Sequence, residues 1–306
     1  MHVSALLRVG MTVTDLRRAE AFYRDGLGFV RGSETVIDDP AWALLMGVAS
    51  AATARTLRMR LGAQEVELVA FDPPGRLYPD VRTAEDEWFQ HVAIVVADME
   101  GAYTKLERLS PASISTDGPQ LLPPNTGGVT AFKFRDPDGH PLELLHFPPG
   151  VGDSVWHHGE GPGPLGYDHS AIVVEDIERS LSFYTDLLGF RVGGRSLNKG
   201  VEQDRLDGLK DCVVDVVGLE PADVPTPHLE LLHYRQPPGR APSTDVQATD
   251  IASTRQVLRV DDLDGLVGRL EEAGAVFVSP GIVTLGNGER AASVRDPDGH
   301  MIMLTQ

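Results

Sequence analysis

Two histidines and two glutamates stand at corresponding places in repeated stretches of the chain. His91 opens the apolar stretch HVAIVV and Glu143 lies within PLELLHF, while His169 and Glu230 hold the same places in HSAIVV and HLELLHY. Imidazole nitrogens and carboxylate oxygens suit a divalent cation such as Zn, Ni, Fe, Mn or Co. A carboxylate left unpaired among leucines would be costly to desolvate, and a bound cation would remove that cost. A single strand histidine is usually satisfied by its neighbours, but the repeated His and Glu pattern favours metal binding.

One turn that occurs twice shows that the repeated stretches are not identical. The sequence RDPDGH occurs at 135–140 and again at 295–300, and each copy runs into an apolar strand. Proline presets φ in this turn and glycine tolerates positive φ. The strand after the first copy carries Glu143, whereas the strand after the second carries Met303 at the matching place. One copy of the unit therefore lacks the carboxylate.

The elements that must position these side chains recur along the whole chain. Each unit starts with a short β-branched strand, followed by an Asp just before a helical pattern. A carboxylate there caps free N–H groups and meets the positive end of the helix. These residues are Asp15, Asp98, Asp176 and Asp262. Each unit then closes on an apolar strand, which predicts four βαβββ modules: module 1 (6–71), module 2 (88–147), module 3 (165–235) and module 4 (249–306).

The length of the chain and its connectors predict two domains. A chain of 306 residues suits two compact domains better than one. The connector 148–164 is rich in Pro and Gly and is expected to be the linker between a first domain, 1–150, and a second domain, 165–306.

Composition restricts the classes of partner. A net charge of −18 argues against nucleic acid and against an anionic membrane. The single cysteine, Cys212, excludes an internal disulfide, suits a reducing compartment and is expected to be a buried thiol. The sequence has no apolar stretch near the ~20 residues of a membrane helix, and its N-terminus does not resemble a secretory signal. We expect a cytoplasmic monomer or homodimer that acts on a small molecule.

The repeated units resemble the vicinal oxygen chelate superfamily, which includes glyoxalase I, methylmalonyl-CoA epimerase, extradiol dioxygenases and bleomycin-resistance proteins. The resemblance covers nearly the whole chain and rests on DHSAIVVEDIERSLSFYTDLLGF, HLELLHY, HVAIVVADME and the two RDPDGH turns. It implies an α+β fold in which the four modules form two cupped mixed β-sheets with helices packed outside. It also implies that each module can offer one metal ligand from its first strand and one from its last.

Carried over position by position, the resemblance assigns different residues to the four modules. The first-strand place holds Arg8, His91, His169 and Arg255, and the last-strand place holds Glu67, Glu143, Glu230 and Met303. Modules 2 and 3 keep both His and Glu, module 1 keeps only Glu, and module 4 keeps neither. The implied ligands of one divalent metal ion are therefore His91, Glu143, His169 and Glu230.

Two pairings of the modules are possible. Neighbouring modules in sequence could pair, which would split the ligands into two incomplete sets. Alternatively, module 2 could pair with module 3 and module 1 with module 4, which would bring all four ligands into one cup. The second pairing explains why complementary ligands survive, and we favour it. The other cup would then hold Arg8, Glu67 and Arg255, with Glu67 paired to one of the arginines.

Several other residues have simpler expected roles. His140 and His300 follow the RDPDG turns and are expected at the surface. Tyr23 and Tyr184 lie at helical spacing and are expected in the core.

The resemblance implies three functions. The first is a metal-dependent isomerase, epimerase or lyase of glyoxalase type, which acts on a substrate with adjacent oxygens through an enediolate, with Glu143 or Glu230 as the base. The second is a ring-cleaving dioxygenase with Fe(II) or Mn(II). The third is a protein of the bleomycin-resistance type that binds a small molecule without a reaction, against which the complete His and Glu set argues.

Overall fold

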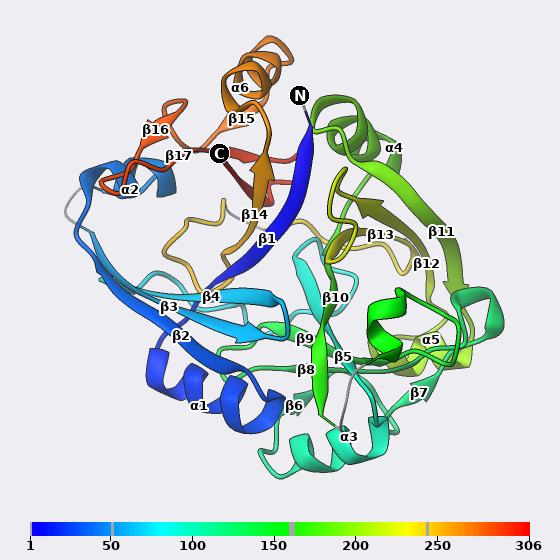
Figure 1. Cartoon of the computed structure of the whole chain (residues 1–306). Helices are drawn as coiled ribbons and strands as arrows, with labels where there is room; N and C mark the ends of the chain where they lie inside the picture. Colours follow the sequence, from blue (N-terminus) through cyan, green and yellow to red (C-terminus); the bar gives the residue numbers. More distant parts are fainter. Residues whose placement is uncertain (1, 50–51, 159–162, 243–244) are drawn as a thin grey trace.

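The computed structural model describes residues 2–49, 52–158, 163–242 and 245–306. Its strands form two mixed sheets of nine strands each, and helices pack against both (Figure 1). This agrees with the α+β fold and the two sheets expected from the sequence. None of the described helices is both long and apolar enough to cross a membrane.

The first sheet joins strands from the two ends of the chain, and we call it the module 1/4 sheet. Its strands are β1 (Val3–Thr12), β2 (Val30–Ile37), β3 (Thr53–Leu61), β4 (Gln64–Asp72), β14 (Thr254–Val260), β15 (Val276–Phe277), β16 (Val283–Thr284), β17 (Arg290–Arg295) and β18 (Met301–Thr305). They follow the order β15-β17-β18-β14-β1-β4-β3-β2, with β16 beside β17. Figure 1 shows β1, in blue, beside β14, in orange.

The second sheet, which we call the module 2/3 sheet, joins strands from the middle of the chain. Its strands are β5 (Phe89–Val96), β6 (Ala112–Ser113), β7 (Gln120–Leu121), β8 (Thr130–Arg135), β9 (Pro141–His146), β10 (Pro164–Val173), β11 (Arg191–Lys199), β12 (Val213–Glu220) and β13 (His228–Gln236). They follow the order β11-β12-β13-β10-β5-β9-β8-β6, with β7 beside β8.

At the middle of each sheet, one antiparallel strand pair joins two modules. These pairs are β1 with β14 and β10 with β5. The first strand of every module also pairs in parallel with the last strand of the same module. The predicted pairing of module 2 with module 3, and of module 1 with module 4, is therefore confirmed. The strands of each half of the chain are divided between the two sheets.

The longer helices begin where the sequence predicts. They are α1 (Leu16–Leu27), α3 (Met99–Glu107), α4 (Ile177–Leu181), which continues into a π-helical turn (Ser182–Leu187), and α6 (Leu263–Glu272). The carboxylates of Asp15, Asp98, Asp176 and Asp262 accept hydrogen bonds from N–H groups of the first turn of these helices. The acidic residue before each helical pattern is therefore an N-cap.

One apolar core lies between the two sheets and these four helices. It takes buried side chains from all four modules, including the predicted core residues Tyr23 and Tyr184. The opposite faces of the sheets, which we call the module 1/4 cup and the module 2/3 cup, carry separate apolar clusters. Because all four modules contribute to this core, differences between modules are expected on the cup faces.

Two short helices were not expected from the sequence, which predicted only helices packed outside the sheets. These are α2 (Pro40–Met46) and α5 (Val201–Asp207), and each ends at a glycine with positive φ. Their buried residues pack inside the cups, α2 against the module 1/4 sheet and α5 beside β7 and β8 of the other sheet. Each helix is only seven residues long, so it leaves little periodic signal in the sequence.

The prediction that the two turn histidines lie at the surface is wrong for His140. This residue is fully buried, with Nδ1 3.0 Å from Asp136 Oδ2 and Nε2 2.9 Å from the carbonyl oxygen of Ile251. His300, in the equivalent turn, is half-buried, and its Nε2 lies 2.7 Å from the carbonyl oxygen of Val173. The first turn packs against the turn that precedes β14 of the module 1/4 sheet, and the second packs against the end of β10 of the module 2/3 sheet. These contacts cover the imidazoles.

Candidate metal centre

Strand register brings the candidate ligands to the middle of the module 2/3 cup. Ala93 on β5 pairs with His169 on β10 at one side and with Glu143 on β9 at the other. Ala171 on β10 is flanked in the same way, by His91 on β5 and by Glu230 on β13. Alternate strand residues point to the same face, so the small alanines leave room between the larger polar side chains.

The four predicted residues meet with close contacts between their donor atoms. Nε2 of His91 lies 3.0 Å from Nε2 of His169 and 3.3 Å from Oε2 of Glu143. Nε2 of His169 lies 3.8 Å from the same Glu143 oxygen and 3.4 Å from Oε2 of Glu230. Ligands held about 2.0–2.2 Å from a divalent cation stand roughly 3–3.6 Å apart. Donor atoms of His91, Glu143 and His169 all lie within 4.8 Å of one another, which suits a single ion between them, and Glu230 approaches this group at His169.

The other ring nitrogen of each histidine has a fixed partner. Nδ1 of His91 makes a short contact with the side-chain oxygen of Gln90, and Nδ1 of His169 lies 3.0 Å from Asp168 Oδ2. Trp156 donates its indole N–H to the other oxygen of Asp168 at 2.7 Å. With an acceptor at each Nδ1 atom, each imidazole in its neutral form would carry the proton there and direct a bare Nε2 lone pair into the cup.

The charges in the cup depend on one another. Burial raises the pKa of Glu143 to about 7, against the opposing effects of Lys133 and His169. Burial alone would lower the pKa of His169, but the carboxylates of Glu230, Asp168 and Glu143 raise it to about 9. A protonated imidazole thus lies where these carboxylates converge.

The remaining two donors titrate in the direction that favours cation binding. The pKa of His91 is well below its ordinary value, first because of burial and then because of Lys133 and His169. Burial would raise the pKa of Glu230, but His169 and His228 outweigh it and lower the pKa. A neutral imidazole and an ionised carboxylate are the forms that bind a metal. Two imidazoles and two carboxylates are a donor set that fits a divalent cation, whose binding would displace the protons held by His169 and Glu143.

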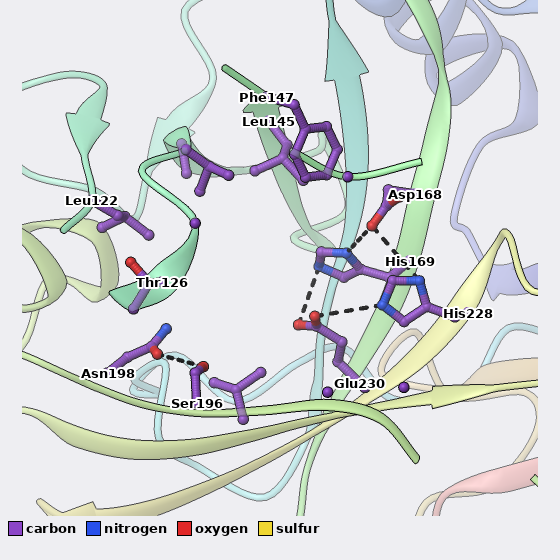
Figure 2. A pocket seen from close by; sticks show the side chains of 18 of the residues that line it. Leu122, Thr126, Leu145, Phe147, Asp168, His169, Ser196, Asn198, His228 and Glu230 are labelled. Atoms are coloured by element: carbon purple, nitrogen blue, oxygen red, sulfur yellow. Dashed lines mark hydrogen bonds and ion pairs between the residues drawn. The ribbon is translucent and has the colours of Figure 1, made fainter. Parts of the chain in front are cut away.

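A fifth residue, His228, belongs to the same cluster and was not singled out in the sequence. It lies on β13, two positions before Glu230, with Nε2 3.6 Å from a Glu230 oxygen and Nδ1 3.7 Å from Asp168. Figure 2 shows Asp168, His169, His228 and Glu230 pointing toward one another. Asp168, His169 and His228 form a second group with metal-ligand spacing. Strand alternation predicts that His228 shares a face with Glu230, and this was the signal available.

The cluster opens into a cavity of about 700 Å³ on the cup face of the module 2/3 sheet. Apolar side chains line one part of it, and Figure 2 shows Leu122, Leu145 and Phe147 there. Polar side chains, including Ser196 and Asn198, line another part (Figure 2). A cavity of this size holds a small organic molecule.

The module 1/4 cup has no comparable cluster among the described residues. Nε of Arg8 lies 3.5 Å from Glu67 Oε1, which confirms the predicted pairing of Glu67 with an arginine. Arg255 is buried and donates to the hydroxyl of Thr12 at 2.9 Å. The rest of this cup is filled by an apolar cluster that includes Trp42, Met46, Phe71, Val257, Met301 and Met303. The two cups thus share their strand framework but differ in their contents.

The sequence model of the Glyoxalase/Bleomycin resistance protein/Dioxygenase superfamily matches residues 5–144 and 166–304. These two ranges cover most of the chain, and the fold and the repeated modules agree with the match. The chain therefore belongs to this superfamily.

Individual sequence relatives match only part of the chain. The biphenyl-2,3-diol 1,2-dioxygenase of Paraburkholderia xenovorans is 34% identical over 107 residues, which are 32% of this chain and 35% of that protein. The match thus spans about a third of the length of the dioxygenase. The uncharacterized protein YwbC of Bacillus subtilis is 27% identical over 139 residues, which are 45% of this chain and 95% of that protein.

Solved structures share the arrangement of the whole chain. Glyoxalase I from Zea mays superposes with a TM-score of 0.62 at 20% identity, over 98% of this chain and 92% of that chain. A putative dioxygenase from Bacillus subtilis gives a TM-score of 0.62 at 14% identity, over 99% of this chain and 85% of that chain. At these identities the likeness shows a common fold.

Proposed function

We propose that the protein is a metal-dependent enzyme of glyoxalase type, an isomerase, epimerase or lyase that acts on a small molecule with adjacent oxygens. Its ligands for one divalent cation are His91, Glu143, His169 and Glu230. The observation that carries the proposal is the convergence of these four side chains from two modules in a single cavity. The match to a superfamily whose description includes glyoxalases agrees with this reaction class.

When bound, the cation polarises the substrate oxygens and stabilises the negative charge that develops as the neighbouring carbon loses a proton. The protein supplies the base. Glu143 or Glu230 takes the proton at a carboxylate oxygen, and its return to the same or to the next carbon decides between epimerisation and isomerisation. Gln90 and Asp168 hold the two imidazole rings in place through their Nδ1 atoms. The apolar wall of the cavity limits the access of water to the reacting carbon.

Metal analysis of the purified protein tests the ligand assignment. A His91→Ala, His169→Ala double variant is expected to lose the bound divalent metal that the wild-type protein retains. The matched control is His146→Ala, His233→Ala, which also removes two imidazoles from the module 2/3 sheet. These side chains interact with the carbonyl oxygens of Val96 and Val174, and they lie outside the cavity. Unchanged metal content in the first double variant would overturn the assignment.

Isotope and oxygen measurements identify the reaction class. The glyoxalase-type reaction predicts that deuterium from the solvent enters a hydroxyketone substrate, with no uptake of oxygen. A metal-loaded protein that binds small molecules but exchanges no proton would instead belong to the sequestering, bleomycin-resistance type. The two measurements thus separate catalysis from binding.

A ring-cleaving dioxygenase is the second candidate, because the identity to biphenyl-2,3-diol 1,2-dioxygenase reaches 34% over the matched segment of 107 residues. Iron in such chemistry usually takes two His and one carboxylate, with open positions for substrate and oxygen. A site built from modules 3 and 4 is unsuitable, because these modules lie in different sheets and module 4 contributes Arg255 and Met303. The module 2/3 cup would serve only with one Glu away from the metal. Oxygen uptake with a catechol would select this alternative.

A further inference from the structure

A buried lysine lies in the same cavity as the candidate metal ligands. Lys133 on β8 is the register partner of Glu143 on β9, and its side chain lines the cavity. Its Nζ donates to Asp207 Oδ1 at 2.6 Å, and both side chains are almost completely buried. Burial disfavours the ammonium, but the carboxylates of Asp207 and Glu143 outweigh it and keep the pKa of Lys133 above its ordinary value. The ion pair with Asp207 therefore holds an ammonium in place at the wall of the cavity.

Asp207, the last residue of α5, is held by several neighbours. Its Oδ2 accepts from Gln203 Nε2 at 2.7 Å and from the hydroxyl of Tyr234 at 3.1 Å. The Tyr234 hydroxyl in turn accepts from Gln90, the residue that contacts His91. Asp207 thus positions the lysine and connects it to the histidine side of the cluster.

Two polar groups beside Asp207 have bonding capacity to spare. A lysine ammonium has three N–H donors, and among the described residues the hydrogen bond of Nζ is the one to Asp207. Gln203 also lines the cavity, and its Oε1 is buried without a hydrogen-bond partner in the described structure. A buried polar group left unpaired is costly, so this acceptor points to a ligand.

The module 1/4 cup supplies an internal comparison, because the repeats place its residues at equivalent positions. Lys133 corresponds to Ser293 and Glu143 to Met303, counted from the shared RDPDGH turns. Asp207 and Gln203 correspond to Met46 and Trp42, counted from the glycines that end α5 and α2; Tyr234 corresponds to Phe71. The cup without the His and Glu set thus has apolar residues at most of these places, and they fill it. The polar network of Lys133, Asp207, Gln203 and Tyr234 is therefore found in the cup that also holds the candidate metal ligands.

We propose that Lys133 and Gln203 form a substrate-binding subsite beside the metal ligands, which recognises a group carrying both an anionic oxygen and a hydroxyl, as in a hydroxycarboxylate. The ammonium of Lys133 binds the anionic oxygen and Oε1 of Gln203 accepts from the hydroxyl. Asp207 is a positioning residue for both. This inference rests on the proposed function, and it narrows the substrate from any compound with adjacent oxygens to an acidic one.

Glycolate is a suitable probe, since it is the smallest hydroxycarboxylate. Its binding is measured by calorimetry with metal-loaded and with metal-free protein. Lys133→Met is expected to weaken glycolate binding at least tenfold in both forms, with metal content unchanged, and Lys133→Arg to retain part of it. The matched control is Lys210→Met, which removes an exposed lysine outside the cavity. Gln203→Leu is expected to weaken glycolate more than it weakens acetate, which lacks the hydroxyl.

Lys133→Met leaves the buried Asp207 without its ion-pair partner, which could destabilise the fold. The double variant Lys133→Met, Asp207→Asn removes both charges and is therefore measured as well. Glycolate affinity within twofold of wild type in either folded variant would overturn the subsite. So would the absence of glycolate binding to the wild-type protein, or loss of metal from the lysine variants, which would show that Lys133 acts on the metal ligands. Failure of the proposed function is a different result, namely metal retained by His91→Ala, His169→Ala.

Discussion

The Nε2 atoms of His91 and His169 lie 3.0 Å apart, although the two residues are separated by 78 positions in the chain. Each ring has an acceptor at its Nδ1 atom, so two lone pairs would face each other if both imidazoles were neutral and nothing lay between them. A proton or a divalent cation relieves that repulsion. The contact depends on the antiparallel pair of β5 and β10, which joins modules 2 and 3.

The interaction of Asp168 with His169 predicts a graded effect on metal affinity. Asp168→Asn keeps the shape of the side chain but removes the charge that fixes the Nδ1 proton of His169. Loss of such a partner typically costs 10–100-fold in metal affinity. We expect a weakening in that range, measured by competition with a chromophoric chelator, while the fold is retained.

Trp156→Phe is a milder companion variant, because it removes only the hydrogen bond from the indole to Asp168. Its metal affinity should fall between those of the wild type and Asp168→Asn. Equal affinity in all three proteins would show that His169 does not bind the ion through Nε2.

Glu143 and Met303 occupy the same position in two modules, and substituting each by the other residue type is expected to have opposite effects on stability in the two cups. Burial raises the pKa of Glu143 to about 7, so the carboxylate costs stability in the metal-free protein. Glu143→Met, which copies the residue of module 4, should therefore abolish tight metal binding yet leave the metal-free protein at least as stable as wild type. Burial outweighs the attraction of Lys133 and His169 at this carboxyl, so its removal relieves a desolvation cost in the metal-free protein. Chemical unfolding of the metal-stripped proteins measures this.

The reverse exchange, Met303→Glu, places a carboxylate in the apolar cluster of the module 1/4 cup. An uncompensated buried charge costs about 3–5 kcal/mol, so this variant should be strongly destabilised at neutral pH. A stability equal to wild type would mean that Arg8 or Arg255 accepts the new carboxylate. In that case the two cups differ less in electrostatics than their contents indicate.

Much of this architecture could be predicted from the sequence because its signals are local and repeated. The Asp residues before the helical patterns predict the N-caps. Counting from the two RDPDGH turns places Glu143 and Met303 at equivalent positions of their strands. The pairing of modules followed from chemistry, since only one arrangement unites the two His and two Glu residues. The division into domains 1–150 and 165–306, the cytoplasmic location and the oligomeric state stay predictions.

Residues that act through long-range contacts could not be predicted in the same way. His140 is buried because its turn reaches Ile251, in the turn that precedes β14 of the other sheet, and nothing in the local sequence reports this contact. Lys133 and Asp207 lie 74 positions apart, and α5, which carries Asp207, is too short to show a period. Tertiary packing of separate modules, which one sequence does not encode locally, determines both features.

Two equivalent aspartates predict opposite responses to pH. The pKa of Asp136 is lowered, because hydrogen bonds and the charge of His140 outweigh burial, whereas burial dominates at Asp296 and raises its pKa. A lowered carboxyl pKa contributes stability above the unfolded value of about 3.9, which is lost on acidification; a raised pKa has the opposite sign. Asp136→Asn should therefore reduce stability at pH 7 more than at about pH 2, where acid has protonated this carboxyl in the folded wild-type protein too, and Asp296→Asn should not. Urea midpoints at both pH values check this, and equal losses for the two variants would contradict it.

Each sheet contains one module from each half of the chain, and this arrangement predicts how the chain behaves when it is cut between the two halves. A fragment that ends at residue 158 contains His91 and Glu143, and a fragment that begins at residue 163 contains His169 and Glu230. Each fragment alone leaves the central strand of every module without its antiparallel partner, since β5 needs β10 and β1 needs β14. We expect that the co-expressed fragments associate and bind one metal ion per pair, measured by gel filtration with metal analysis. Each fragment alone should bind metal weakly and self-associate through its exposed strands. A monomeric single fragment with wild-type metal affinity would show that one half completes the site by itself, and would contradict the shared centre.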